Sequence, residues 1–219
     1  MPVCPRDLRA LLFDLDGTLL DSFQSHLEVY QATLARFGVR LTEADFRRHY
    51  SPNWNEFYER VGLAREHWDA ASVHWLQEAA AHQPRPFPGV AETLGRLRRR
   101  FRLGLVTAGS RSRVEADLER GGIAGYFEVI VTADDVLQPK PAPDGLQAAL
   151  NALGLGANEA LYIGDTEPDF EFACAGGVGF VGVTSAFSTS HPVGDYRRLA
   201  SIADLPTLLD TEPAPEHRV

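Results

Sequence analysis

Five short, almost wholly apolar runs restrict the possible folds of this sequence more than any other feature. They show no alternation of polar and apolar positions, which is typical of strands buried on both faces of a parallel sheet. A helical pattern precedes each of the last four runs, at 90–100, 111–120, 143–153 and 169–175. This order predicts an α/β fold with a doubly wound, mostly parallel sheet. The five runs are Ala10–Asp14, Leu103–Thr107, Glu128–Thr132, Ala160–Ile163 and Gly179–Val183.

A long helical insertion separates the first run from the second. It begins with an amphipathic stripe formed by Phe23, Leu27, Tyr30, Leu34 and Phe37. Two more helices are expected near 54–61 and 68–79, with a loop broken by Pro52 before them. We therefore predict a core domain of residues 1–21 and 87–219 and a helical cap domain of residues 22–86. The tail over 211–219 is expected to be disordered.

Composition narrows the classes of function. The 219 residues are enough to bury a core without disulfides. The 30 acidic and 21 basic residues give a net charge of −9, which argues against binding nucleic acid or an anionic membrane through bulk charge. Two cysteines, Cys4 and Cys174, cannot form a disulfide framework. With no signal peptide and no membrane-length apolar run, we expect a cytoplasmic protein.

Polar residues follow the predicted strands where the strands end. Because the carboxyl ends of parallel strands meet at one edge of the sheet, we expect these residues to converge there. They would bring together four carboxylates, one ammonium group and one hydroxyl. The residues are Asp14 and Asp16 after the first run, Thr107 after the second, Lys140 before the third helix, and Asp165 and Asp169 after the fourth run.

Such a cluster suits phosphoryl chemistry. Carboxylates placed this close repel one another, and a hard divalent cation such as Mg²⁺ would compensate their charge. The cation, the lysine and neutral donors can bind the oxygens of a phosphoryl group. One carboxylate can attack phosphorus, and a second can protonate the leaving oxygen. Each residue also has a simpler interpretation, since Asp-Gly is a common turn signal and most lysines are solvated.

The stretch from Phe13 to Ser22, FDLDGTLLDS, resembles the first motif of the haloacid dehalogenase superfamily. Thr107, Lys140 and the stretch from Gly164 to Asp169 resemble its second, third and fourth motifs, in the same order. The resemblance covers nearly the whole chain. It is nearest to the branch of phosphoglycolate phosphatases and β-phosphoglucomutases, which carry a helical cap after the first motif.

The resemblance implies a role for each matching residue. Asp14 would be the nucleophile, and Asp16 the general acid and base. Thr107, the backbone of Ala108 and Lys140 would hold the phosphoryl group. The metal ligands would be Asp14, the backbone carbonyl of Asp16, and Asp165, whereas Asp169 would fix a metal-bound water or orient Lys140.

The cap residues are harder to assign. His26 lies ten residues after Asp16, and in related mutases a histidine at this spacing reaches the general acid. A histidine at the edge of a helix is an equally ordinary interpretation. In the loop around Pro52, we expect Arg47, His49 and Asn53 to contact the substrate, with a solvated surface as the alternative.

The sequence therefore predicts a Mg²⁺-dependent phosphatase that acts on a small phosphorylated metabolite, with phosphoglycolate as the first candidate. The alternative is a phosphosugar mutase of the β-phosphoglucomutase kind. A third possibility is a non-catalytic member that binds a ligand or a protein. The chain is expected to be a monomer or a homodimer.

Overall fold

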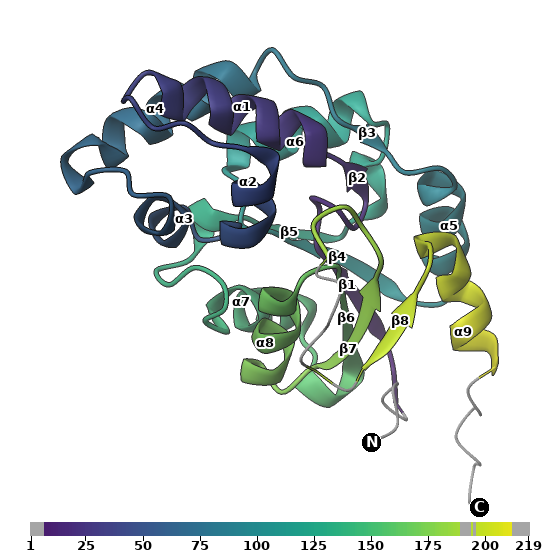
Figure 1. Cartoon of the computed structure of the whole chain (residues 1–219). Helices are drawn as coiled ribbons and strands as arrows, with labels where there is room; N and C mark the ends of the chain where they lie inside the picture. The colour runs from purple at the N-terminus through teal and green to yellow at the C-terminus, as the bar shows by residue number, and fades with distance from the viewer. Residues whose placement is uncertain (1–6, 189–193, 195, 212–219) are drawn as a thin grey trace, which may run out of the picture.

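A parallel sheet forms the centre of the molecule (Figure 1). The computed structural model describes residues 7–188, 194 and 196–211. In the described chain the sheet has six strands in the order β5-β4-β1-β6-β7-β8, and all its pairings are parallel. The chain moves outward from β1 on both sides, so the sheet is doubly wound, as predicted. The strands are β1 (Ala10–Phe13), β4 (Arg102–Val106), β5 (Val129–Val131), β6 (Ala160–Gly164), β7 (Gly179–Val183) and β8 (Arg197–Leu199).

The apolar runs predicted five of these strands, and β8 was missed. It is only three residues long, carries two arginines and lies at the edge of the sheet, where it pairs with β7 alone. Such a strand has no continuous apolar run to reveal it. An edge position and charged side chains are common together, because charge discourages pairing with another chain.

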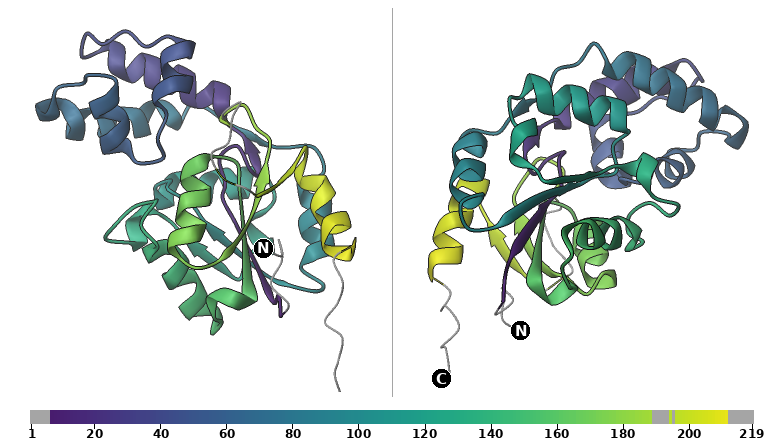
Figure 2. Two further views of the ribbon diagram at one scale, coloured as in Figure 1. Left: turned by 60° about the horizontal axis from the view of Figure 1, so that its bottom comes forward. Right: turned by 180° about the vertical axis from the view of Figure 1, so that it is seen from behind.

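Helices cover both faces of the sheet (Figure 2). On one face, leucine and valine side chains of α5 (Val90–Leu97), α6 (Arg111–Arg120) and α9 (Leu205–Thr211) pack against β1 and β4. On the other face, α7 (Asp144–Leu153) and α8 (Glu167–Ala175) pack against β1 and β6. The strands are therefore buried on both sides, which explains why their sequences are continuously apolar. Single 3-10 turns lie at Arg65–His67, Ala124–Tyr126, Ala133–Asp135, Ala157–Glu159 and Ile202–Asp204.

Four helices lie over the edge at which the sheet strands end (Figure 1). They have an aromatic core of their own, to which Phe187 contributes from the loop after β7. The connections to this unit run side by side, because β2 (Leu20–Asp21) pairs antiparallel with β3 (Arg85–Pro86). The four helices are α1 (Phe23–Ala35), α2 (Glu43–His49), α3 (Trp54–Arg60) and α4 (Trp68–Ala79).

Three details differ from the expectations. The expected loop around Pro52 begins later, because Arg47 and His49 belong to α2, which a Thr42–Asp45 capping box initiates. Cys174 is exposed. Of the tail expected to be disordered, Thr211 ends α9 and residues 212–219 lie outside the described part. No helix in the described ranges combines the length and hydropathy needed to cross a bilayer.

Candidate active site

Three carboxylates meet at the edge of the sheet below the helical unit. Asp14 follows β1, Asp165 follows β6, and Asp169 lies in the first turn of α8. Each offers an oxygen that lies within 4.8 Å of the others, and all three side chains are buried. Carboxylate oxygens at this spacing are suitable ligands for a divalent cation. The convergence expected from the strand order is present.

Lys140 lies among these carboxylates. Its Nζ donates to Oδ1 of Asp14 at 2.7 Å and to Oδ1 of Asp169 at 3.0 Å. It also donates to the hydroxyl of Tyr162, a residue that the sequence did not single out. One ammonium group faces three carboxylates, so the buried cluster carries excess negative charge. A divalent cation would neutralise that excess, and the oxygen-rich donor set fits one.

Burial and the neighbouring charges shift the pKa values of the three carboxyls in different directions. Burial raises the pKa of Asp14 to about 7, although the charge of Lys140 opposes the increase. Burial, followed by the negative charges of Asp169 and Asp14, raises the pKa of Asp165 well above its usual value. Burial also disfavours the charged form of Asp169, but the charge of Lys140 and the hydrogen bonds from Thr166 and Lys140 together outweigh it and lower the pKa of that carboxyl. The chain therefore stabilises the charge of Asp169 better than that of Asp165.

Hydroxyl groups and one glycine hold Asp165 in place. Thr18 donates to its Oδ1 at 3.1 Å, and Ser185 donates to its Oδ2. Gly17 has a φ of +78°, and a Cβ at that position would collide with the Asp165 carboxylate. Glycine is therefore required here both for the backbone conformation and for the close approach.

Asp169 is fixed through both of its oxygens. Its Oδ2 accepts from the hydroxyl of Thr166 at 2.6 Å and from the Thr166 backbone N–H at 3.1 Å, which closes a capping box at the start of α8. Its Oδ1 accepts from Lys140. Of the two roles that the resemblance implies for Asp169, orienting Lys140 is the one with a direct contact.

The loop after β4 lies beside Asp14. The Thr107 backbone N–H donates to the carbonyl of Val131 at 3.0 Å, and its hydroxyl accepts from the N–H of Gly109 at 3.2 Å. Thr107 and Ala108 line the same pocket as Asp14. The two residues therefore lie on the same side of the sheet edge as the Asp14 carboxylate, as the strand order predicted.

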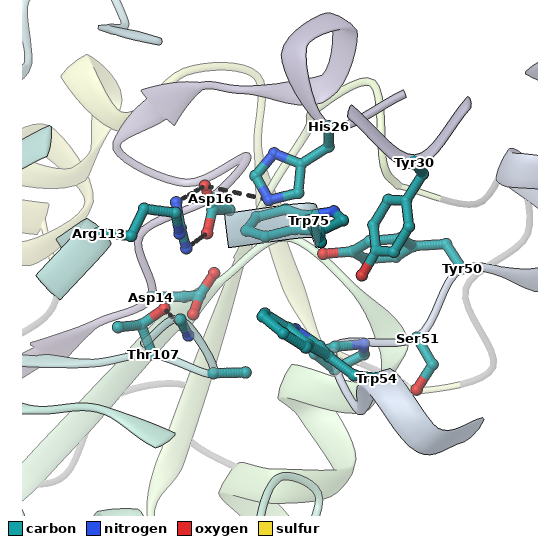
Figure 3. A pocket seen from close by; sticks show the side chains of 13 residues that line it. Asp14, Asp16, His26, Tyr30, Tyr50, Ser51, Trp54, Trp75, Thr107 and Arg113 are labelled. Carbon is teal, nitrogen blue, oxygen red and sulfur yellow. Dashed lines mark hydrogen bonds and ion pairs between the residues drawn. The ribbon is translucent and has the colours of Figure 1, made fainter. Parts of the chain in front are cut away.

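Asp16 lies in the same pocket as Asp14, and its carboxylate meets Arg113 (Figure 3). Both of its oxygens face the guanidinium of Arg113, at 2.6 and 3.2 Å. Burial opposes ionisation, yet the charge of Arg113 lowers the pKa of Asp16 far below its usual range. His26 lies near the same carboxylate, with Nε2 at 3.8 Å from Oδ1.

Aromatic side chains of the helical unit cover the pocket (Figure 3). Trp54 and Trp75 pack with ring centroids 5.0 Å apart, and Tyr30 and Tyr50 lie beside them. Arg113 is the one arginine or lysine among the described lining residues. The helical unit therefore gives the pocket a mainly aromatic wall, whereas the core contributes the charged groups of Asp14, Asp16 and Arg113.

The cap residues chosen from the sequence are only partly at this pocket. His26 lines it, but Arg47, His49 and Asn53 do not. Arg47 donates to the carbonyl of Ala186 at 2.5 Å, and Asn53 caps α3 by accepting from the N–H of Asn55. Their neighbours Tyr50, Ser51, Pro52 and Trp54 line the pocket instead.

The sequence pattern of the haloacid dehalogenase-like hydrolase family matches residues 11–183. This match spans most of the chain and includes Asp14, Lys140 and Asp165. The chain therefore belongs to the haloacid dehalogenase-like hydrolases, as the four motifs predicted.

Similar proteins narrow the class to phosphatases. A phosphoglycolate phosphatase from Yersinia pseudotuberculosis is 31% identical over 229 residues, which cover 94% of this chain and 97% of the relative. Pyrophosphatase PpaX from Bacillus velezensis is 30% identical over 194 residues, which cover 85% and 88%. A solved structure from Bacteroides fragilis, assigned to the haloacid dehalogenase-like hydrolases, has a TM-score of 0.84 at 28% identity and covers 90% of this chain and 99% of its own. The chain is a phosphatase of this family.

Proposed function

We propose that this chain is a Mg²⁺-dependent phosphatase that hydrolyses a small phosphomonoester through an aspartyl phosphate on Asp14. The contact that supports this proposal most directly is the one between Lys140 and Asp14, inside a cluster that can hold a divalent cation. Mg²⁺ fits because the donors are carboxylate oxygens. Asp14 and Asp165 would be its side-chain ligands, and the backbone carbonyl of Asp16 would complete the set from the protein. The cation would neutralise charge on the phosphoryl oxygens.

In the first step, the Asp14 carboxylate attacks phosphorus and the bond to the leaving oxygen breaks. Arg113 keeps Asp16 ionised in the empty site, so Asp16 has to take up a proton when the negatively charged phosphoester binds beside it. It then gives this proton to the leaving oxygen, and Arg113 stabilises the carboxylate that remains. In the second step, water attacks the phosphorus of phospho-Asp14 and loses a proton to Asp16. Inorganic phosphate leaves, and both aspartates return to their starting forms. Lys140 and Thr107 hold the phosphoryl group throughout.

The pocket favours hydrolysis over a mutase reaction. A phosphosugar mutase has to hold a second phosphate away from the reacting one. Among the described lining residues Arg113 is the one arginine or lysine, and its Nη atoms already contact Asp16 and Asp117. Arg113 belongs to α6 of the core, so the described lining residues of the helical unit include no arginine or lysine. A phosphatase needs no such second site.

We also propose that the helical unit of residues 22–86 acts as a cap that opens to admit substrate and closes to exclude water. Phosphoglycolate is the first compound to test, because relatives that match nearly the whole chain carry the name phosphoglycolate phosphatase. The low cysteine content agrees with a reducing, cytoplasmic environment.

The test is hydrolysis of 4-nitrophenyl phosphate and phosphoglycolate by the wild type and by Asp14→Asn, with Mg²⁺ and with excess chelator. We expect metal-dependent turnover that Asp14→Asn abolishes, and an acid-stable or hydroxylamine-sensitive phosphoryl group on Asp14 after rapid quenching. Turnover by Asp14→Asn at the wild-type rate would disprove the proposed intermediate. A wild type that transfers the phosphoryl group back to a sugar, and not to water, would instead identify a mutase.

A further inference from the structure

The forked ion pair between Arg113 and Asp16 is the most specific contact that the expected motifs leave unexplained. Nη2 of Arg113 lies 2.6 Å from Oδ2 of Asp16, and Nη1 lies 3.2 Å from Oδ1. The two side chains are 9% and 10% exposed. A guanidinium that meets both oxygens of a carboxylate fixes its orientation as well as its distance. The orientation of Asp16 is therefore set by Arg113.

His26, the other neighbour of Asp16, cannot supply this orientation. Its Nδ1 lies 2.9 Å from the carbonyl of Ser22, so Nδ1 carries the hydrogen of the neutral ring. Nε2 then has no hydrogen to donate to Asp16, from which it lies 3.8 Å away. Burial keeps the ring neutral by lowering the pKa of His26. In addition, His26 belongs to α1 of the cap, whereas Asp16 belongs to the core.

Arg113 itself is anchored within the core. Its Nη1 also contacts Oδ2 of Asp117 at 3.1 Å, one turn further along α6. Asp117 is almost fully buried and accepts at 2.5 Å from Arg120. These three residues share α6, which begins directly after the loop that contains Thr107. The ion-pair anchor of Arg113 therefore lies on the helix that follows the phosphoryl-binding loop, and its guanidinium also lies 5.8 Å from the centroid of the Trp75 ring in the helical unit.

Gly109 makes room for the Arg113 side chain. A Cβ at Gly109 would collide with Nη2 of Arg113, the atom that contacts Asp16 most closely. The φ of Gly109 is not in the left-handed region, so the backbone conformation does not require glycine here. Glycine at position 109 therefore leaves room for the guanidinium of Arg113, which passes close to its Cα.

We propose that Arg113 is a positioning residue that holds the carboxyl group of Asp16 at the leaving oxygen of the substrate. The proposal rests on the proposed function, because it assumes that Asp16 protonates the leaving group. In this role Arg113 acts through Asp16, because both of its terminal nitrogens already contact carboxylates.

This role predicts a particular dependence on the leaving group. Nitrophenolate leaves readily without a proton, whereas phenolate is more basic and depends more on protonation. Phenyl phosphate and 4-nitrophenyl phosphate differ by one nitro group, so they can bind the same site but need protonation of the leaving oxygen to different extents. Misplacing Asp16 should slow phenyl phosphate much more than 4-nitrophenyl phosphate. Loss of folding or of phosphoryl binding would slow both esters alike.

The experiment compares kcat/KM of the two esters for wild type, Arg113→Lys, Arg113→Ala and Arg111→Gln, with Mg²⁺ present. Arg113→Lys keeps the charge and loses the fork, so it avoids leaving two buried carboxylates without a partner. Arg111 is the matched control, since it lies on the same helix and pairs only with exposed or half-buried partners. Circular dichroism and thermal melting confirm that each variant is folded.

We expect Arg113→Lys to lower kcat/KM for phenyl phosphate by about 10²-fold, within the range that a general acid contributes, and for 4-nitrophenyl phosphate by less than about 10-fold. KM should change little, and Arg111→Gln should match the wild type. Added guanidinium should restore Arg113→Ala more for phenyl phosphate than for its nitro analogue. An equal loss for both esters, a loss confined to KM, or no loss would overturn the proposal.

The same assay separates this proposal from the proposed function. Asp14→Asn should remove turnover of both esters, because it removes the nucleophile. The Arg113 variants should change the ratio of the two rates. If Asp14→Asn still turned over both esters with the wild-type ratio of rates, the aspartyl phosphate would be contradicted. The ratio measured for Arg113→Lys would still test the positioning role by itself.

Discussion

Lys140, the one lysine in the 219-residue sequence, places its Nζ 2.7 Å from Oδ1 of Asp14. The other basic residues, apart from histidines, are arginines. A lysine ammonium is a compact point charge, and it fits between Asp14, Asp169 and the ring of Tyr162, where a planar guanidinium would need more space. The carboxylate cluster therefore contains the one lysine of a chain whose other side chains of permanent positive charge are arginines.

Replacing this lysine should harm both activity and stability. Lys140→Arg keeps the charge but overfills the site, and Lys140→Gln leaves the carboxylates uncompensated. Breaking a buried ion pair from one side costs about 3–5 kcal/mol, so Lys140→Gln should melt at a markedly lower temperature in chelator. Mg²⁺ should recover part of that loss by supplying positive charge. Thermal melting and aryl phosphate turnover, each with and without Mg²⁺, test this, and a Lys140→Gln variant as active as the wild type would contradict it.

The single lysine also gives a direct report on metal binding. Protein labelled with ¹⁵N only at lysine should show one side-chain Nζ resonance. We expect Mg²⁺ to shift that resonance at neutral pH, because the cation would bind within the carboxylate cluster that Lys140 contacts. Asp165→Asn should weaken the response, while Asp21→Asn, which changes an exposed aspartate, should leave it intact. An Mg²⁺ titration that never moves the resonance would place the metal elsewhere.

Asp165 should make metal-free protein less stable as pH rises. Burial and the neighbouring negative charges raise its pKa in the folded state above the unfolded value of about 4. A carboxyl of this kind contributes stability below the unfolded pKa and loses that contribution as pH increases toward the folded pKa. Relative to Asp165→Asn, the wild type should lose at most about 1.4 kcal/mol per pH unit above pH 4. Urea unfolding in chelator from pH 4.5 to 7.5 measures the difference, with Asp21→Asn as control; a pH-independent difference would refute the assignment.

The residues that could be predicted are those whose position follows from local sequence. Asp14 and Asp165 each follow an apolar run, so identifying the strand also located the carboxylate at its end. The parallel order of the strands then brought Lys140 and Asp169 to the same edge. The helix over 111–120 was predicted with the bounds that the structure has, because charged and apolar positions alternate with helical spacing there.

The residues that were missed depend on contacts between distant parts of the chain. Arg113 contacts Asp16 across 97 positions, and Ser185 reaches Asp165 across 20. In isolation, Arg113 resembles any charged residue on an exposed helix. The misassigned loop is different, because the Thr42–Asp45 capping box was present in the sequence. The basic residues Arg47 to His49 suggested a binding loop, whereas cations also suit the last turn of a helix.

His26 should contribute far less to catalysis than Arg113. The neutral ring donates through Nδ1 to Ser22 and packs against Trp75 and Phe187, so its contact with Asp16 adds little. His26→Asn can keep a donor near the position of Nδ1. We expect it to lower kcat/KM for phenyl phosphate by less than about 10-fold, below the usual range for a general acid. A loss of 10²-fold or more, with 4-nitrophenyl phosphate spared, would show that His26 shares the positioning of Asp16.

Phe187 should couple the cap to the core. It lies in the loop after β7, yet its ring packs within the aromatic core of the helical unit, with centroids 4.7 Å from Tyr50 and 5.1 Å from Phe23. Truncating a phenylalanine inside a single core lowers the free energy of unfolding by about 3–5 kcal/mol. Phe187 instead joins the helical unit to the core domain, so Phe187→Ala should mainly weaken the contact between these two parts. The variant should therefore favour the open cap and lower kcat/KM for both esters equally. Phe187→Leu keeps an apolar contact and should stay close to the wild type. Hydrogen exchange measures the change directly: faster exchange in α1 with unchanged exchange in β1 is expected, and uniform acceleration throughout the core would show that Phe187 stabilises the whole fold instead.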